Sequence, residues 1–226
     1  MYNGLMDELK IYNRVLTPLE IASSYQAYTN GKPVPVITYE EIKIDRAQFK
    51  DDPNRPQYHA IPPGHWMNEP HAPFYYNGKY HLTYQHNPTG PYWHQIHWGH
   101  WVSDDLVHWK DEPEAIFPED DGVSPDGIWS GSATVDEKGK PVLVYTFGDW
   151  SKVLNQGVAL AFPKDPDDPN LTEWIKDTKP LIVQADRQGL AGEFRDPFAW
   201  KDVANNKWYM LVGSGIAQTG GTAWIY

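Results

Sequence analysis

Residues 78–84, G-K-Y-H-L-T-Y, decide the fold, because the same pattern returns twice further along the chain. The echoes are residues 139–145, G-K-P-V-L-V-Y, and residues 206–212, N-K-W-Y-M-L-V, so the spacings are 61 and 67 residues. Each segment starts with a turn-forming residue and continues with strand-favouring residues, which predicts the turn and second strand of a β-hairpin. A second pair of echoes, residues 105–109 and 170–174, lies 65 residues apart. Since this period suits a four-stranded blade, we predict an all-β fold, part of a β-propeller.

A polar residue precedes each of the three hairpin turns by nine or ten positions. These residues are Glu69, Ser130 and Asp196. In a propeller the first strand of each blade lines the central channel, so equivalent positions in consecutive blades converge. We therefore expect the three side chains to face one cavity, where two carboxylates would be the pair that glycoside hydrolysis requires.

Residues 1–30 differ in character from the rest of the chain. Residues 4–12 alternate like a strand, and Thr17–Pro18 predict the N-cap and first residue of a helix that ends near Tyr28. This pattern resembles the last strand and helix of a laminin-G-like, concanavalin-type jelly roll, which implies a C-terminal remnant of such a domain. Residues 31–56, rich in proline and charge, predict a linker.

Composition restricts the class of partner. The net charge of −11 argues against nucleic acid and anionic membranes, whereas a neutral polysaccharide is indifferent to it. The aromatic content of 14% suits both a β-rich core and stacking on sugar rings. The chain has no cysteine and therefore no thiol chemistry. No apolar run approaches a membrane span, and the first residues show no signal peptide.

The histidines do not predict a metal site. All nine lie between residues 59 and 108, and His94, His97 and His100 are three positions apart. In a strand the middle one would point away from the other two, and no cysteine or H-E-x-x-H motif accompanies them. We expect no metal and no other cofactor, with histidines that pack in the core or bind sugar.

Five segments resemble glycoside hydrolase family 32, the invertases, inulinases and levanases. Three carry its motifs: residues 65–71, H-W-M-N-E-P-H, resemble W-M-N-D-P-N; residues 129–133, W-S-G-S-A, resemble [WF]-S-G-S; and residues 193–197, E-F-R-D-P, contain R-D-P. Residues 84–88 and 98–109 also fit in order and spacing. The resemblance implies that residues 57–226 hold about the first three blades of a five-bladed catalytic propeller.

The resemblance also implies roles for single residues. Glu69 stands where the family has a nucleophilic aspartate, and Asp196 where it has a transition-state stabiliser. Arg195 stands where it would pair with the acid/base carboxylate or bind sugar. Further positions that shape the fructose pocket are Asn68, Gln85, Trp93, Trp129 and Ser130. The implied reaction is retaining hydrolysis of β-fructosidic bonds in sucrose or fructans, by a parent protein located outside the cell or at its surface.

Two departures from the family pattern leave alternatives open. Glu69 is one methylene longer than the family's aspartate, so it is either a working nucleophile or a mark of lost activity; its intact neighbours Trp66, Asn68 and Pro70 favour the former. The family's acid/base glutamate has no counterpart here, because no glutamate follows Glu193. We therefore expect this chain to end before that residue and to be inactive alone. The other hypotheses are a non-catalytic fructan-binding propeller and a related glycosidase acting on arabinose-containing chains, against which the W-M-N and W-S-G-S motifs argue.

Overall fold

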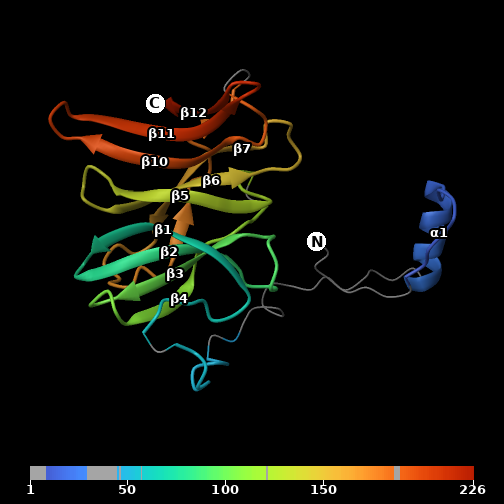
Figure 1. Cartoon of the computed structure of the whole chain (residues 1–226), viewed down its shortest axis with the longest axis horizontal. Helices are drawn as coiled ribbons and strands as arrows, with labels where there is room; N and C mark the ends of the chain where they lie inside the picture. The colour runs from blue at the N-terminus through green and yellow to red at the C-terminus, as the bar shows by residue number, and fades with distance from the viewer. Residues whose placement is uncertain (1–8, 30–44, 46, 57, 121, 186–188) are drawn as a thin grey trace. The chain divides into compact units, whose positions relative to one another are not determined.

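The computed structural model describes residues 9–29, 45, 47–56, 58–120, 122–185 and 189–226 (Figure 1). The chain divides into two compact units, residues 1–43 and 44–226, which are described separately. No helix within the described ranges is long and apolar enough to cross a membrane.

The first unit contains the helix α1 (Pro18–Thr29). Its first turn is a capping box: the Glu20 N–H donates to Thr17 Oγ1 (3.3 Å), and the Thr17 N–H donates to Glu20 Oε2 (2.8 Å). The predicted N-cap and helix are therefore confirmed. Residues 9–12, the described part of the expected strand, form no strand, and the rest of that segment lies outside the described residues. The jelly-roll remnant stays a prediction, as does the linker, of which the described residues 47–56 form turns.

The second unit contains three antiparallel sheets whose strands pair in chain order, apart from the last short strand of the second sheet (Figure 1). The first sheet contains β1 (Trp66–Tyr76), β2 (Lys79–Asn87), β3 (His97–Ser103) and β4 (Trp109–Ile116). The second contains β5 (Gly127–Val135), β6 (Pro141–Gly148), β7 (Gln156–Pro163), β8 (Trp174–Lys176) and β9 (Ile182–Val183), with β8 and β9 both paired to β7. The third contains β10 (Phe194–Asp202), β11 (Lys207–Ile216) and β12 (Gly220–Ile225). The described sheets are successive blades, so the predicted all-β, partial propeller is confirmed.

The three repeated segments form hairpins, as predicted. Asn77 and Gly78 connect β1 to β2 with positive φ angles of 48° and 82°, as a two-residue type I′ turn requires. In the two later hairpins, Gly139 (75°) and Asn206 (51°) take the same left-handed conformation. Glycine and asparagine tolerate it best among the residues, which is why they mark the repeat.

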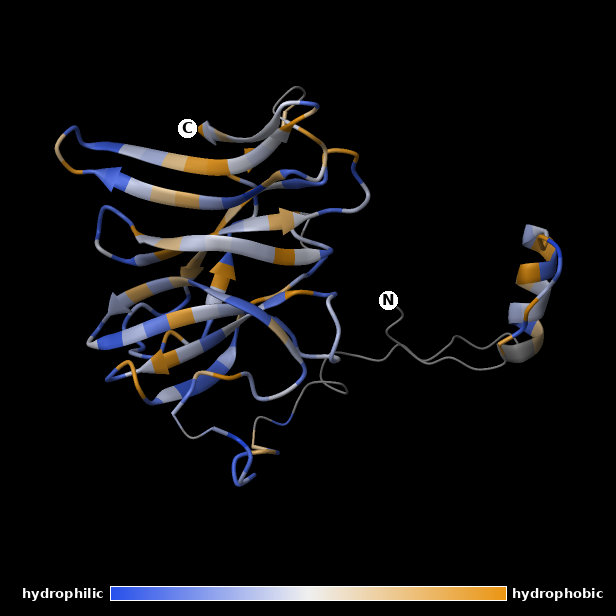
Figure 2. Cartoon of the chain, viewed as in Figure 1, coloured by the Kyte–Doolittle hydropathy of each residue, from blue (hydrophilic) through white to orange (hydrophobic). Residues whose placement is uncertain are grey.

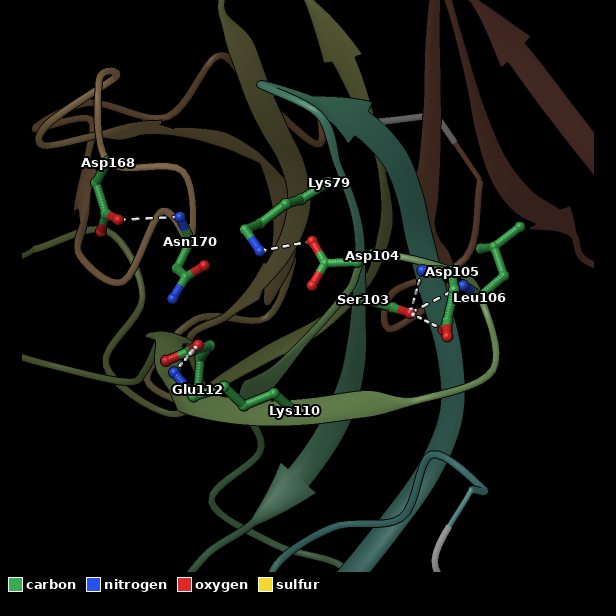
Figure 3. A network of polar contacts seen from close by, with 9 residues as sticks. All are labelled: Lys79, Ser103, Asp104, Asp105, Leu106, Lys110, Glu112, Asp168 and Asn170. Carbon is green, nitrogen blue, oxygen red and sulfur yellow. Dashed lines mark hydrogen bonds and ion pairs between the residues drawn. The ribbon is translucent and has the colours of Figure 1, made fainter.

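The second pair of echoes is also structurally equivalent. Leu106 and Leu171, 65 residues apart, both have a positive φ, 65° and 46°. The Ser103 hydroxyl accepts the N–H of Leu106 (2.9 Å), whereas an Asp168 carboxylate oxygen accepts the N–H of Asn170 (2.9 Å) (Figure 3). Local side-chain acceptors therefore stabilise both turns before the outer strand of each blade.

Apolar layers between the sheets stabilise the stack. Hydrophobic and hydrophilic residues mix along the strands of all three sheets (Figure 2). The strand β6 is buried on both faces: Leu143, Tyr145 and Phe147 belong to the core shared with the first sheet, whereas Val142 and Val144 belong to the core shared with the third. Because side chains alternate along a strand, the continuous apolar run at residues 141–145 is that of a central strand covered on both sides.

Candidate active site

A β-bulge interrupts the first strand of each described blade. The pairing shifts lie between Met67 and Pro70, between Trp129 and Gly131, and between Arg195 and Phe198. The bulges contain Glu69, Ser130 and Asp196, the three polar residues that the repeat singles out. A bulge leaves its extra residue outside the ladder and redirects the side chain, and such features are frequent next to active sites.

The local sequence explains why the strands bulge there. Pro70 and Pro197 have no N–H to donate to a ladder, which suits them to bulges. At Gly131 the backbone of the next strand is too close for a side chain, because a Cβ atom would lie 2.0 Å from the Val144 carbonyl oxygen. Asp196 itself adopts a φ of 59°, a left-handed conformation that aspartate tolerates better than most residues. The family-like motifs thus encode backbone geometry as well as chemistry.

Gly131→Ala is expected to destabilise the folded chain by about 1–3 kcal/mol, because the strands must separate to admit the methyl group. Chemical denaturation would measure the change. Gly221→Ala is the matched control, since a Cβ atom there meets nothing within 4 Å, and it should leave the denaturation midpoint nearly unchanged. Equal stability of the two variants would contradict this account of the second bulge.

The bulges open onto a cavity of about 350 Å³. Every site residue expected from the sequence lines it: Asn68, Glu69, Gln85, Trp93, Trp129, Ser130, Arg195 and Asp196. The expectation that Glu69, Ser130 and Asp196 face a common cavity is confirmed. No histidine is among the lining residues, and several histidines, such as His81 and His100, are instead buried within the first sheet.

A chain of hydrogen bonds holds the Glu69 carboxylate. The Asn68 amide donates to Gln85 Oε1 (3.4 Å), and the buried Gln85 donates from Nε2 to Ser130 Oγ (2.7 Å). The Ser130 hydroxyl in turn donates to Glu69 Oε1. Gln85 and Ser130 each accept one hydrogen bond and donate another, so all the bonds of the series can form at once. The series therefore aligns the carboxylate with groups from two blades.

Asp196 lies in a different electrostatic setting. Its side chain reaches solvent through the cavity, but the cavity walls remove part of its hydration, which raises the pKa of the carboxyl group above its ordinary value. The negative charges of Glu69 and Glu193 act in the same direction, and the positive charge of Arg195 opposes them. Arg195 forms an ion pair with Glu193 (3.0 Å), so the interaction expected with an acid/base carboxylate stays a prediction.

Three lining residues were not expected from the sequence: Trp150, Gln156 and Gly192. The half-exposed Trp150 packs against Trp129 with ring centroids 5.3 Å apart, and Gln156 Oε1 accepts the N–H of Phe194 (2.9 Å). None of the three belongs to a repeated segment or a motif. A tryptophan two residues after an apolar strand was the only available signal, and it is ambiguous because many tryptophans here are core residues.

A larger cavity of about 530 Å³ lies between the second and third sheets, apart from these residues. Its walls are mainly apolar, and the acidic residues among them are Asp136 and Glu137. The Glu137 carboxylate binds Lys201 and the Trp208 indole N–H. The Asp136 carboxylate accepts the backbone N–H groups of Lys138 and Lys140 within its own turn, so both carboxylates are engaged by protein groups. The smaller cavity is therefore the better candidate site, since polar groups converge there.

Known proteins resemble this chain over most of its length. The model of the glycosyl hydrolases family 32 N-terminal domain matches residues 59–226. The chain is 41% identical over 202 residues to β-fructofuranosidase, insoluble isoenzyme 2, of Oryza sativa subsp. indica, covering 84% of the chain and 33% of that protein. It is 44% identical over 177 residues to the cell wall isozyme of β-fructofuranosidase from Zea mays, covering 76% and 29%.

Solved structures agree with these relatives. Fructan 1-exohydrolase IIa from Cichorium intybus matches with a TM-score of 0.69 at 37% identity, covering 77% of this chain and 32% of that one. Sucrose-6-phosphate hydrolase from Lactobacillus gasseri matches with a TM-score of 0.67 at 30% identity, covering 84% and 40%. The chain thus spans about a third of the length of the curated relatives. The family model and the relatives together show that the chain belongs to glycoside hydrolase family 32.

Proposed function

We propose that the complete protein containing this chain is a retaining glycosidase that cleaves β-fructosidic bonds in sucrose or in fructans such as inulin and levan. The observation that carries the proposal is the convergence of Glu69 and Asp196 on one cavity, with Ser130 bound to the Glu69 carboxylate. A solved variant of fructan 1-exohydrolase IIa from Cichorium intybus is in complex with 1-kestose, and a solved variant of a Bombyx mori β-fructofuranosidase is in complex with sucrose. Both ligands contain fructose, which supports a fructose-containing oligo- or polysaccharide as partner.

In the proposed reaction Glu69 is the nucleophile. Its carboxylate attacks the anomeric carbon of the fructosyl unit, the glycosidic C–O bond breaks, and an acid elsewhere in the protein protonates the leaving oxygen. Water then attacks the same carbon and gives its proton to the acid/base residue, which releases fructose and frees the Glu69 carboxylate. Asp196 hydrogen-bonds fructose hydroxyls and stabilises the positive charge of the oxocarbenium-like transition state. Six further residues are proposed to shape the fructose pocket, and their place around the cavity supports this role: Asn68, Gln85, Trp93, Trp129, Ser130 and Arg195.

We further propose that the acid/base glutamate lies beyond Tyr226 and that residues 1–226 alone turn over no substrate. Leaving-group protonation contributes about 10²–10⁴-fold to catalysis. Fructose release from sucrose, inulin and levan is expected from the complete protein and not from residues 1–226. An isolated chain with ordinary enzyme turnover would show that the acid lies within it.

A non-catalytic fructan-binding propeller is the second candidate, favoured by one observation, the glutamate at position 69 where the family has aspartate. It predicts that the complete protein binds levan or inulin without releasing fructose. The same assay, run beside a binding measurement, separates the two candidates.

For the location, we propose that the complete protein acts outside the cell or at its surface. The support is that one relative is a cell wall isozyme. Fractionation of the producing cells followed by detection of the protein would test this proposal.

A further inference from the structure

A single buried hydroxyl group connects two of the bulges that line the cavity. Thr146 Oγ1 donates to the Ser130 carbonyl oxygen (2.9 Å) and accepts the Asp196 backbone N–H (2.9 Å). Thr146 is fully buried in β6, and it does not line the cavity. Since side chains alternate along a strand, it points to the same face as Val142 and Val144, toward the third sheet.

Both backbone groups need this partner. The bulges remove Ser130 and Asp196 from their own ladders, and the φ of 59° at Asp196 is a conformation that surrounding contacts must hold. A buried backbone group left without a partner loses its hydration and destabilises the fold. A hydroxyl has one donor and two acceptor sites, so a single threonine satisfies a carbonyl and an N–H together.

The first blade contains an equivalent connection. Gln85 precedes Thr146 by 61 residues, the spacing of the repeat, and also lies opposite the bulge of its own blade. Its amide accepts from Asn68 in that bulge and donates to Ser130 in the bulge of the next blade. Gln85 and Thr146 therefore act at the same place in successive blades, each linking its own bulge to the following one.

We propose that Thr146 is a positioning residue that sets the placement of Asp196 relative to Glu69. This inference rests on the proposed function. The Ser130 hydroxyl binds the Glu69 carboxylate while the Ser130 carbonyl is bound by Thr146, which also holds the Asp196 backbone. The two carboxylates are thus joined through one serine and one threonine. Catalytic geometry is sensitive to such links, since a displacement of about 1 Å lowers rates by about 10²-fold.

Thr146→Val in the complete protein tests the proposal, because valine keeps the shape and removes the hydroxyl. We expect kcat on sucrose or inulin to fall by about 10–100-fold with KM changed little. The acidic limb of the pH profile of kcat should move to lower pH, since an Asp196 carboxyl displaced from the cavity walls loses the partial desolvation that raises its pKa. Thr146→Ser retains the hydroxyl and should keep kcat within about threefold of the wild type.

Thr83→Val is the matched control. Thr83 is equally buried in the second strand of the first blade, but its hydroxyl donates to the His71 carbonyl (3.0 Å) within its own sheet. It should lower the unfolding midpoint about as much as Thr146→Val while leaving kcat and its pH profile unchanged. Wild-type kcat and pH profile in Thr146→Val would overturn the proposal, as would an equal loss of kcat in Thr83→Val.

A crystal structure of Thr146→Val separates this inference from the proposed function. If the wild type releases no fructose from any β-fructoside, the proposed function fails, but the link is still testable. We then expect Asp196 to leave the positive-φ region and its distance from Glu69 to change. Unaltered bulges in the variant would refute the positioning role whether or not the protein is active.

Discussion

Glu69→Gln in the complete protein is expected to lower kcat by about 10³-fold or more, because an amide does not attack the anomeric carbon. Fructose binding should stay nearly intact, since glutamine matches the carboxylate in shape and its amide oxygen still accepts the Ser130 hydroxyl hydrogen. Steady-state kinetics would give kcat, and isothermal calorimetry with fructose would give the affinity. A variant with most of its activity left would show that Glu69 is not the nucleophile.

The shorter carboxylate distinguishes a working Glu69 from a decayed one. In a working site the hydrogen bond from the Ser130 hydroxyl is fitted to the length of glutamate, so Glu69→Asp should reduce kcat. In a site that lost activity through the added methylene, the same substitution restores the family residue and should increase kcat. An inactive wild type rescued by aspartate would contradict the proposed nucleophile and favour the binding propeller.

Asp196→Asn has the second largest expected effect, a fall in kcat of about 10²–10³-fold, because the amide does not balance the charge that develops on the sugar ring. The same change should raise the unfolding midpoint at neutral pH. Desolvation raises the pKa of Asp196 in the folded protein above its value in the unfolded chain. The protonated side chain therefore stabilises the fold fully at pH values below the pKa of the unfolded state, and this contribution is lost as the pH rises through the pKa of the folded state.

Asparagine does not ionise, so Asp196→Asn avoids the loss of stability that the wild type undergoes as Asp196 ionises. The difference in stability between the variant and the wild type should therefore shrink as the pH is lowered. Thermal unfolding of the wild type and Asp196→Asn across the acid range would measure it, with kcat measured in parallel. A variant that is less stable than the wild type at neutral pH would show that Asp196 is stabilising when ionised.

The fold was largely predictable because its signals are local. Turn residues such as Gly78 and Gly139 and the apolar run at residues 141–145 each specify conformation within a few positions. The place of the site followed from the repeat, which puts Glu69 and Asp196 at equivalent points of different blades. The helix α1 was also predictable, since its cap is formed by Thr17 and Glu20 with Arg14 bound to the same glutamate, all within a few positions.

The remaining features depend on contacts between blades. Nothing in the sequence around Thr146 distinguishes it from a core threonine, because its two partners come from β5 and β10. Trp150 and Gln156 reach the cavity from the ends of β6 and β7, outside every motif. The strand expected at residues 4–12 has no counterpart in residues 9–12, since alternation predicts a strand only where another strand pairs with it.

The central claim is that Glu69 forms a covalent bond to the fructosyl unit, and trapping that intermediate tests it most directly. The complete protein would be mixed with sucrose, quenched in acid during turnover, digested and analysed by peptide mass spectrometry. We predict that the peptide containing Glu69 gains the mass of one fructosyl residue on the Glu69 side chain and that Glu69→Gln shows no adduct. An active protein with the adduct on another residue, or with none at all, would contradict the account.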